Sequence, residues 1–254
     1  MNDLALNDEQ REWHEARLDI VPESMMENTE FFSTLSHELR TPLATIKGFA
    51  QTLIAHWDDL PSDRRRRHVE YILRSTLRLE RLVGDLSTSS RLVDGISVLP
   101  GHVEAFDVLT QAVGEAQVLY PNRVFRLESP DADQDIWADR DRLLQVVINL
   151  LDNAAKYSPA AEPIILRWFP DGPQVRVEVY DAGTSLTLEE QGRLFTRYCR
   201  LGRSKQADGI VAGSGLGLYI CKSLIEAMNG HIGIETDEAG SGNTFWFTVP
   251  NRAA

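Results

Sequence analysis

Two long segments in the first third of the chain repeat apolar residues at steps of three and four, the spacing of a helix that buries one face. The stretch "DDLPSD", residues 58–63, reads as a turn between them, with Ser62 or Asp63 as the N-cap of the second helix. Pro22 suits the first turn of the first helix. Two helices joined by a short turn form an antiparallel hairpin, which alone buries too little apolar surface. We therefore expect a second copy and a dimeric four-helix bundle, built on the stripe positions Phe32, Leu35, Leu39, Leu43, Ile46, Ala50 and Leu53, and Val69, Ile72, Thr76, Leu79, Val83 and Leu86.

The pattern changes at residues 92–107, which carry two glycines and a proline. Beyond this stretch, short strand-like runs alternate with amphipathic helices, which indicates an α+β sandwich, a sheet with helices on one face. We therefore expect three parts: a linker helix at 1–22, a hairpin domain at 23–97 and an α/β domain at 98–254. The expected helices of the last part are 108–119, 140–158 and 215–230, and the expected strands are 123–129, 135–139, 163–169, 174–183, 231–236 and 243–250.

Charge and composition exclude several classes of function. A net charge of −12 argues against nucleic acid as the main ligand. The run of arginines at 64–67 is expected to be a solvated helix face or a docking surface. Two cysteines, Cys199 and Cys221, are too few and too poorly placed for a disulfide framework or a zinc site, and they indicate a reducing compartment. No apolar run reaches the roughly 18 residues that span a bilayer.

One histidine lies on the polar side of the first expected helix. His37 is rotated by roughly 160° from the mean direction of the apolar stripe, because each residue of a helix turns about 100°. Thr41, one turn later, lies beside it, and Glu38 lies on the flank. An imidazole is a nucleophile near neutral pH, and a neighbouring carboxylate can orient it and take its proton. A histidine that faces solvent usually has no chemical role, and this geometry permits the catalytic role without establishing it.

The stretch "FFSTLSHELRTPLATIKGFAQTL" resembles the phosphoacceptor box of sensor histidine kinases. Five further blocks follow in the order that this family has. "NLLDNAAKYS" is similar to its N box, "DAGTSL" to its G1 box, "LFTRYCR" to its F box, "GSGLGLYI" to its G2 box and "GSGNTF" to its late glycine box. The resemblance covers about residues 25–250.

This resemblance implies a dimerisation and phosphotransfer hairpin followed by a Bergerat-type ATP-binding domain. It implies a homodimeric protein-histidine kinase that uses ATP and Mg²⁺ and passes the phosphoryl group to an aspartate of a response regulator. The chain would then be cytoplasmic, either by itself or as the cytoplasmic part of a larger sensor. The resemblance assigns the attack on the γ-phosphate to His37, proton acceptance to Glu38, and alignment of water for dephosphorylation of the regulator to Thr41.

The resemblance also assigns the nucleotide site. Asn153 would bind the metal, Lys156 the phosphates, Asp181 the adenine amino group and Arg200 the γ-phosphate. On the expected helix, Asn149, Asn153 and Lys156 share one side, opposite Leu144, Val147, Leu151 and Ala154. Glycines before a helix let backbone N–H groups approach phosphate. The remaining positions expected to contact nucleotide are Asn149, Tyr157, Gly183, Gly213, Gly215, Leu216 and Gly217.

One block departs from the family pattern. The G1 pattern Asp-x-Gly-x-Gly reads Asp181-Ala182-Gly183-Thr184-Ser185 here, with serine in place of the second glycine. If that position needs a positive φ, serine is strained and ATP binding is weakened. Alternatively, the loop has adapted and the serine hydroxyl caps the following "LTLEEQ". Two rival functions therefore stand beside the kinase, a nucleotide-impaired or phosphatase-dominant signalling module and a different ATPase or serine kinase on the same sandwich. The second rival does not account for the histidine box.

Overall fold

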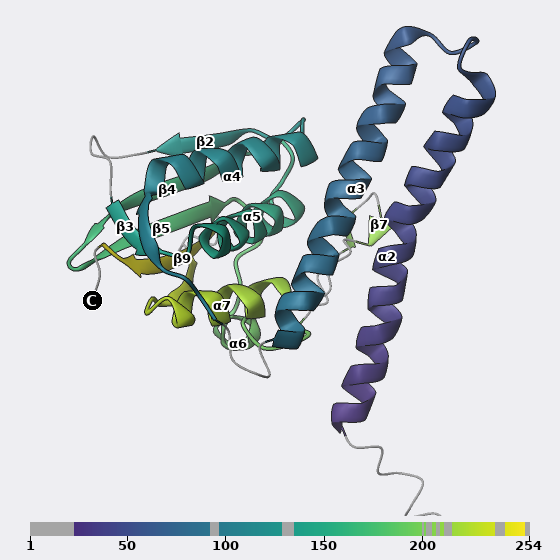
Figure 1. Cartoon of the computed structure of the whole chain (residues 1–254). Coiled ribbons are helices and arrows are strands. Elements are labelled where there is room, and N and C mark those ends of the chain that lie inside the picture. The colour runs from purple at the N-terminus through teal and green to yellow at the C-terminus, as the bar shows by residue number, and fades with distance from the viewer. Residues whose placement is uncertain are drawn as a thin grey trace, which may run out of the picture.

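The computed structural model (Figure 1) describes residues 23–91, 97–128, 135–199, 201, 205–206, 209–210, 215–236 and 242–251. The expected linker helix at 1–22 lies outside the described residues. A long hairpin is followed by an α/β part, and the C-terminal half of the second hairpin helix lies against that part. None of the described helices is long and apolar enough to cross a membrane.

The hairpin consists of α2 (Glu23–His56) and α3 (Ser62–Arg91), as the two apolar stripes predict. The turn between them closes with a hydrogen bond of 3.0 Å from Leu60 N–H to the His56 carbonyl. Leu53 and Leu82 are buried in the hairpin, and the Phe49 and Tyr71 rings stack at 4.8 Å. Of the arginine run, Arg66 and Arg67 form exposed ion pairs along α3.

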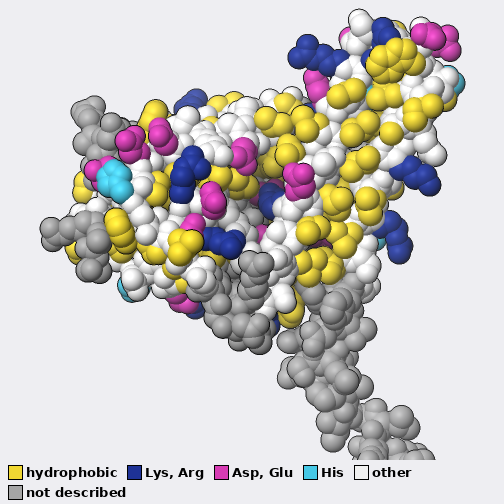
Figure 2. All heavy atoms as spheres, in the orientation of Figure 1, with side chains coloured by type: hydrophobic (Ala, Val, Ile, Leu, Met, Phe, Trp, Pro, Cys, Tyr) yellow, Lys and Arg dark blue, Asp and Glu magenta, His cyan; other side chains and the backbone are white. Residues whose placement is uncertain are grey.

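Much of the hairpin's apolar surface stays uncovered in the single chain. Figure 2 shows hydrophobic side chains gathered along the length of the hairpin. Stripe positions on both helices are half exposed, at 51% for Leu43, 50% for Val69 and 55% for Val83. The hairpin therefore presents an apolar face that its own two helices do not bury.

A five-stranded sheet in the order β2-β4-β5-β9-β8 forms the centre of the second part. Only the β2–β4 pair is parallel. Helices α4, α5 and α7 cover one face of this sheet, which confirms the expected α+β sandwich (Figure 1). The elements are α4 (Ala105–Leu119), β2 (Phe125–Glu128), α5 (Arg140–Tyr157), β4 (Ile164–Asp171), β5 (Gln174–Asp181), α7 (Gly217–Ala227), β8 (Ile232–Thr236) and β9 (Asn243–Pro250).

Alternation of side chains along the central strands builds the core. On β5, Val175, Val177 and Val179 are buried, and β9 sets Val249, Phe247 and Phe245 directly opposite them. The next pair in this row is polar, Asp181 opposite Asn243. The helix-covered face of the sheet therefore ends in a buried polar pair, at the point where the chain leaves β5.

Several short elements differ from the expectations. Residues 92–107, where the pattern changes, contain β1 (Gly101–Glu104), which pairs with β3 (Asp135–Ala138). Helix α4 starts directly after β1. Neither the six-residue helix α6 (Leu188–Arg193) nor the two-residue pair β6 (Lys205–Gln206) and β7 (Gly209–Ile210) was expected. Segments this short do not repeat often enough to show a period, so pairing partners decide their structure.

Candidate nucleotide and phosphoacceptor sites

The histidine box lies in the middle of α2. His37 is exposed, as its rotation from the apolar stripe predicts. The Thr41 Oγ1 hydroxyl donates to the His37 carbonyl at 3.1 Å. Glu38, on the flank of the helix, is only 2% exposed, so this flank is buried. It lies between Leu35 and Leu39, which belong to the apolar cluster that Leu86 of α3 also joins.

Helix α5, which carries the N-box sequence, is held at both ends. The Asp139 side chain caps its start by accepting from Arg142 N–H at 3.2 Å. At its end the Arg123 guanidinium donates to the Ala155 carbonyl and, at 2.6 Å, to the Ser158 carbonyl. Together these contacts fix the position of a helix whose last turn carries Lys156 and Tyr157.

The side chains of α5 are more buried than expected for a helix that buries only one face. Asn149 is only 4% exposed, although the periodicity placed it opposite the apolar face. Its Nδ2 has no hydrogen-bond partner among the described residues. Asn153 is half buried and Tyr157 is exposed. The reason is that α3 and α7 both pack on α5, so its expected polar side also meets protein.

An ion cluster that the sequence did not indicate surrounds Asp152. Lys156 approaches the Asp152 carboxylate at 2.6 Å and Arg81 of α3 at 2.9 Å, and the Tyr120 hydroxyl donates to it at 2.5 Å. Burial alone would raise the pKa of Asp152, but the charges of Lys156 and Arg81 outweigh burial and hold that pKa well below its usual range. Lys156, expected to bind phosphate, is thus paired with a carboxylate one turn before it.

Asp181 and Gly183 form the end of β5. Asp181 is 2% exposed, and its Oδ1 accepts from Gly183 N–H at 2.7 Å. Burial raises the pKa of Asp181 to about 6, although hydrogen bonds from Gly183 and Asn243 partly offset this. A Cβ on Gly183 would lie 2.5 Å from Asp181 Oδ1 and 2.9 Å from the Tyr157 carbonyl oxygen. Only glycine fits here, so the turn brings backbone against the last residue of α5.

Ser185 is accommodated, and the expected strain is absent. Among the described residues, only Tyr198 and Asn229 are non-glycine residues with a positive φ. The Ser185 hydroxyl donates to the Gly242 carbonyl at 3.3 Å. The cap of the following helix is supplied instead by Thr187, which forms a capping box with Glu190. The prediction of a strained serine was therefore wrong, and the alternative of an adapted loop holds with a different bonding partner.

Part of the glycine-rich segment is also described. Gly215 has a φ of 70°, and a Cβ there would lie 2.8 Å from the Tyr198 backbone. Leu216 is buried, and Gly217 at the start of α7 lies close to the Asn149 side chain. The structure thus brings the N-box and G2 residues together. Arg200 and Gly213 lie outside the described residues.

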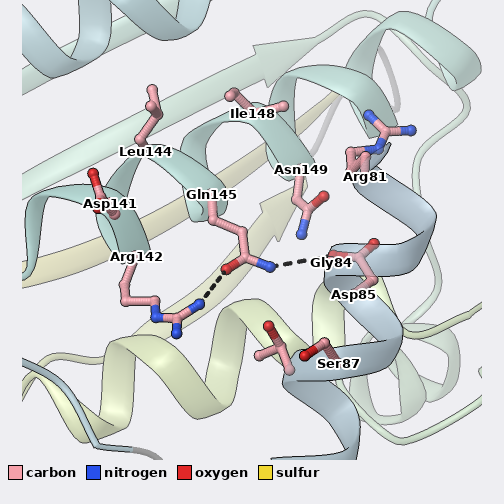
Figure 3. Close-up of a pocket in the computed structure, with 11 residues that line it drawn as sticks. Arg81, Gly84, Asp85, Ser87, Asp141, Arg142, Leu144, Gln145, Ile148 and Asn149 are labelled. Carbon is pink, nitrogen blue, oxygen red and sulfur yellow. Dashed lines mark hydrogen bonds between the residues drawn. The ribbon is translucent and has the colours of Figure 1, made fainter. Parts of the chain in front are cut away.

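A pocket of about 360 Å³ lies between α3 and α5 (Figure 3). Gln145 and Asn149 of α5 point toward Asp85 of α3, and the Gln145 amide donates to Asp85 Oδ1 at 3.3 Å. Burial raises the pKa of Asp85, and the charge of Arg81 only partly offsets this. Nearby, Arg197 donates to the Ser89 carbonyl at 3.0 Å. The hairpin therefore contacts the helix that carries the N box through polar and charged groups.

Comparison with known proteins identifies the two parts of this fold. Residues 138–253 match the model of histidine kinase-, DNA gyrase B- and HSP90-like ATPases. Residues 27–95 match the phosphoacceptor domain of His Kinase A. The fold and the site thus define an ATPase-type domain that follows a histidine phosphoacceptor hairpin.

The chain is similar to several sensor proteins. It is 34% identical over 234 residues to Drug sensory protein A of Synechocystis sp.. The matched region covers 87% of this chain and 34% of that protein. The crystal structure of full-length ShkA in complex with AMPPNP is 28% identical with a TM-score of 0.57, over 89% of this chain and 47% of that one. The chain spans about a third of the length of Drug sensory protein A.

A further solved structure supports the fold alone. It is histidine kinase ThkA in complex with response regulator protein TrrA, 24% identical with a TM-score of 0.57, over 96% of this chain and 66% of that chain. The two matched domain models and the similarity to Drug sensory protein A show that the chain has the phosphoacceptor hairpin and the ATPase domain of a two-component sensor histidine kinase.

Proposed function

We propose that this chain is an ATP-dependent protein-histidine kinase that phosphorylates its own His37. The observation that carries the proposal is the exposed His37 on a hairpin helix, joined in one chain to a domain whose Asp181 and Gly183 form a buried polar turn. The family resemblance assigns a carboxylate to the adenine amino group, and the burial of Asp181 in a turn that admits only glycine supports this use of it.

The reaction is an in-line phosphoryl transfer. A ring nitrogen of His37 attacks the γ-phosphorus, an N–P bond forms, the bond between the γ-phosphorus and the β–γ bridging oxygen breaks, and ADP leaves. The proton on the other ring nitrogen passes to a base, a role that we assign to Glu38. Positioning and charge stabilisation supply most of the catalysis of such transfers.

We further propose that Asn149, Asn153, Lys156 and Tyr157 face the nucleotide. The buried Nδ2 of Asn149, which has no bonding partner among the described residues, is a donor available to a phosphate oxygen. Mg²⁺ is held by few protein ligands together with substrate phosphates, which suits a single amide oxygen from Asn153. No cluster of three acidic, histidine or cysteine side chains that could hold a metal is found in the described part of the chain. Gly215, Leu216 and Gly217 would line the phosphate end, together with Arg200 and Gly213.

The partners that we propose are a second copy of the chain and the receiver domain of a response regulator. The exposed apolar face of the hairpin supports the first. The similarity to ThkA, solved with its response regulator, supports the second. Thr41, one turn from His37, is our candidate for aligning water when the phosphorylated regulator is hydrolysed.

Labelled ATP with Mg²⁺ tests the proposal. We expect an acid-labile, base-stable label on the wild type and none on His37→Gln, which should still bind ATP because the nucleotide residues lie on other elements. Label that persists on His37→Gln would reject the assignment of His37. Thr41→Ala should lower phosphatase activity more than autophosphorylation, whereas equal losses would indicate a structural effect.

A further inference from the structure

The last residue pair of the β5–β9 ladder is the starting observation. Asp181 and Asn243 are directly opposite each other, at the end of the row that contains Val179 and Phe245. Side chains of directly opposite residues lie on the same face, with Cβ atoms roughly 5 Å apart. Both residues are buried, at 2% and 5% exposure. The register of the sheet therefore places an amide beside the carboxylate that we assign to adenine.

The Asn243 amide is bonded to the loop that follows Asp181. Its Nδ2 donates to the Thr184 carbonyl at 3.2 Å, and its Oδ1 accepts from Leu186 N–H at 3.2 Å. The Asn243 amide is also directly opposite Asp181 in the ladder, and it lowers the pKa of the Asp181 carboxyl. An amide has two N–H donors and a carbonyl acceptor, so asparagine can make both loop bonds and still have an N–H for the Asp181 carboxylate. A hydroxyl has one donor and a carboxylate has none, so serine, threonine and aspartate cannot replace it fully.

Ser185 adds a further hydrogen bond between this loop and the segment that leads into β9. Its hydroxyl bonds to the carbonyl of Gly242, the residue just before Asn243. A Cβ on Gly242 would lie 2.6 Å from the Asp181 carbonyl oxygen, so the two segments are in close contact there. Three consecutive loop residues, 184–186, are thus bonded to Asn243, the first residue of β9, and to Gly242 just before it.

We propose that Asn243 is a positioning residue of the nucleotide site. It holds the Asp181 carboxylate and residues 184–186 in their binding arrangement, and the Ser185 hydroxyl adds a further hydrogen bond between the same two segments. The inference rests on the proposed role of Asp181 in nucleotide binding. Asn243 acts through Asp181 and the loop rather than on the reacting phosphate. Its removal should therefore lower ATP affinity and leave the chemistry at His37 unchanged at saturating ATP.

The test is an ATP titration of the full chain by calorimetry between pH 5 and 8, for the wild type, Asn243→Ala and Asn243→Thr. Thr244→Ala, the neighbouring change on the other side of β9, is the matched control. We expect affinity about tenfold weaker for Asn243→Ala, a smaller loss for Asn243→Thr and none for the control. The side-chain amide of Asn243 favours the charged form of Asp181. The pH midpoint of ATP binding should therefore also move upward in Asn243→Ala.

Two results of the titration would overturn the proposal. The first is wild-type affinity in Asn243→Ala, and the second is an equal loss at every pH with an unmoved midpoint, which indicates a merely structural role. Hydrogen exchange of the Leu186 amide gives a readout without nucleotide, and we expect it to be protected in the wild type and faster in both Asn243 variants. An unprotected Leu186 amide in the wild type would contradict the proposal even if Asn243→Ala fails to fold. Absence of ATP binding by the wild type would instead refute the proposed function.

Discussion

Asp181 is a buried carboxylate whose charge state should control nucleotide binding. Burial raises its pKa to about 6. The ionised form accepts a hydrogen bond from an amino group, and protonation weakens that acceptor. We therefore expect ATP affinity to fall as the pH decreases through about 6, measured by calorimetry at constant ionic strength.

The same pKa has the opposite effect on the stability of the free chain. Since the folded-state pKa lies above the ordinary value of 3.8, ionised Asp181 costs stability above pH 6. That cost is removed as the pH falls from about 6 towards 4. Asp181→Asn should lose this contribution to the pH dependence of the unfolding free energy. An unchanged dependence in that variant would show that Asp181 is not the titrating group.

Replacing Ser185 with glycine should not improve ATP binding. Its φ is not positive, so glycine relieves no strain there, and the bond to the Gly242 carbonyl would be lost. We expect Ser185→Gly to bind ATP equally well or more weakly than the wild type in parallel titrations. Tenfold tighter ATP binding by Ser185→Gly would instead support the hypothesis that this chain is a nucleotide-impaired signalling module.

At the scale of elements, the contact between α3 and α5 includes a buried ion cluster around Asp152. Arg81→Met keeps the side-chain length but removes one cation from Asp152, which retains Lys156 and Tyr120. We expect a loss of roughly 2 kcal/mol in this contact, the scale of a hydrogen bond to a charged group. Faster hydrogen exchange in residues 81–89 measures it, and the exposed change Glu80→Gln is the control. Equal exchange in both variants would mean that Arg81 does not hold the helices together.

The same cluster gives the contact a pH limit. The pKa of Asp152 is held below its ordinary value of 3.8, so its ionised form stabilises the fold. This contribution is complete above pH about 4 and is lost as the pH falls below that value. Asp85, on the other side of the pocket, has a raised pKa and acts in the opposite sense.

At the scale of the whole molecule, the exposed hairpin face predicts a dimer. Val69, Leu73 and Val83 lie on one side of α3 and are each half exposed, at 50%, 50% and 55%. A soluble chain rarely leaves such a row uncovered. We expect light scattering at micromolar concentration to give twice the mass of the chain, and Val69→Glu to give a single mass. Val118→Glu, at a valine of α4 that is 45% exposed, should leave the dimer intact. A monomeric wild type would contradict this.

The sequence by itself determined the hairpin, the order of the longer elements and the exposure of His37, because each depends on a period that repeats within one segment. The fit of Gly183 and the departure at Ser185 could also be located from the family pattern. The period did not place Asn149 correctly, since it identifies the apolar side of a helix and cannot show that a second helix covers the polar side as well.

Tertiary structure alone decided which distant residues meet. The sheet register put Asn243 beside Asp181, and the docking of α3 on α5 gave Asp152 a cation from the hairpin. It also buried Glu38 and removed the strain expected at Ser185. The physical reason is that burial and hydrogen bonding depend on what packs against a residue, and packing partners come from anywhere in the chain, whereas a local pattern reports only how a segment distributes its own side chains.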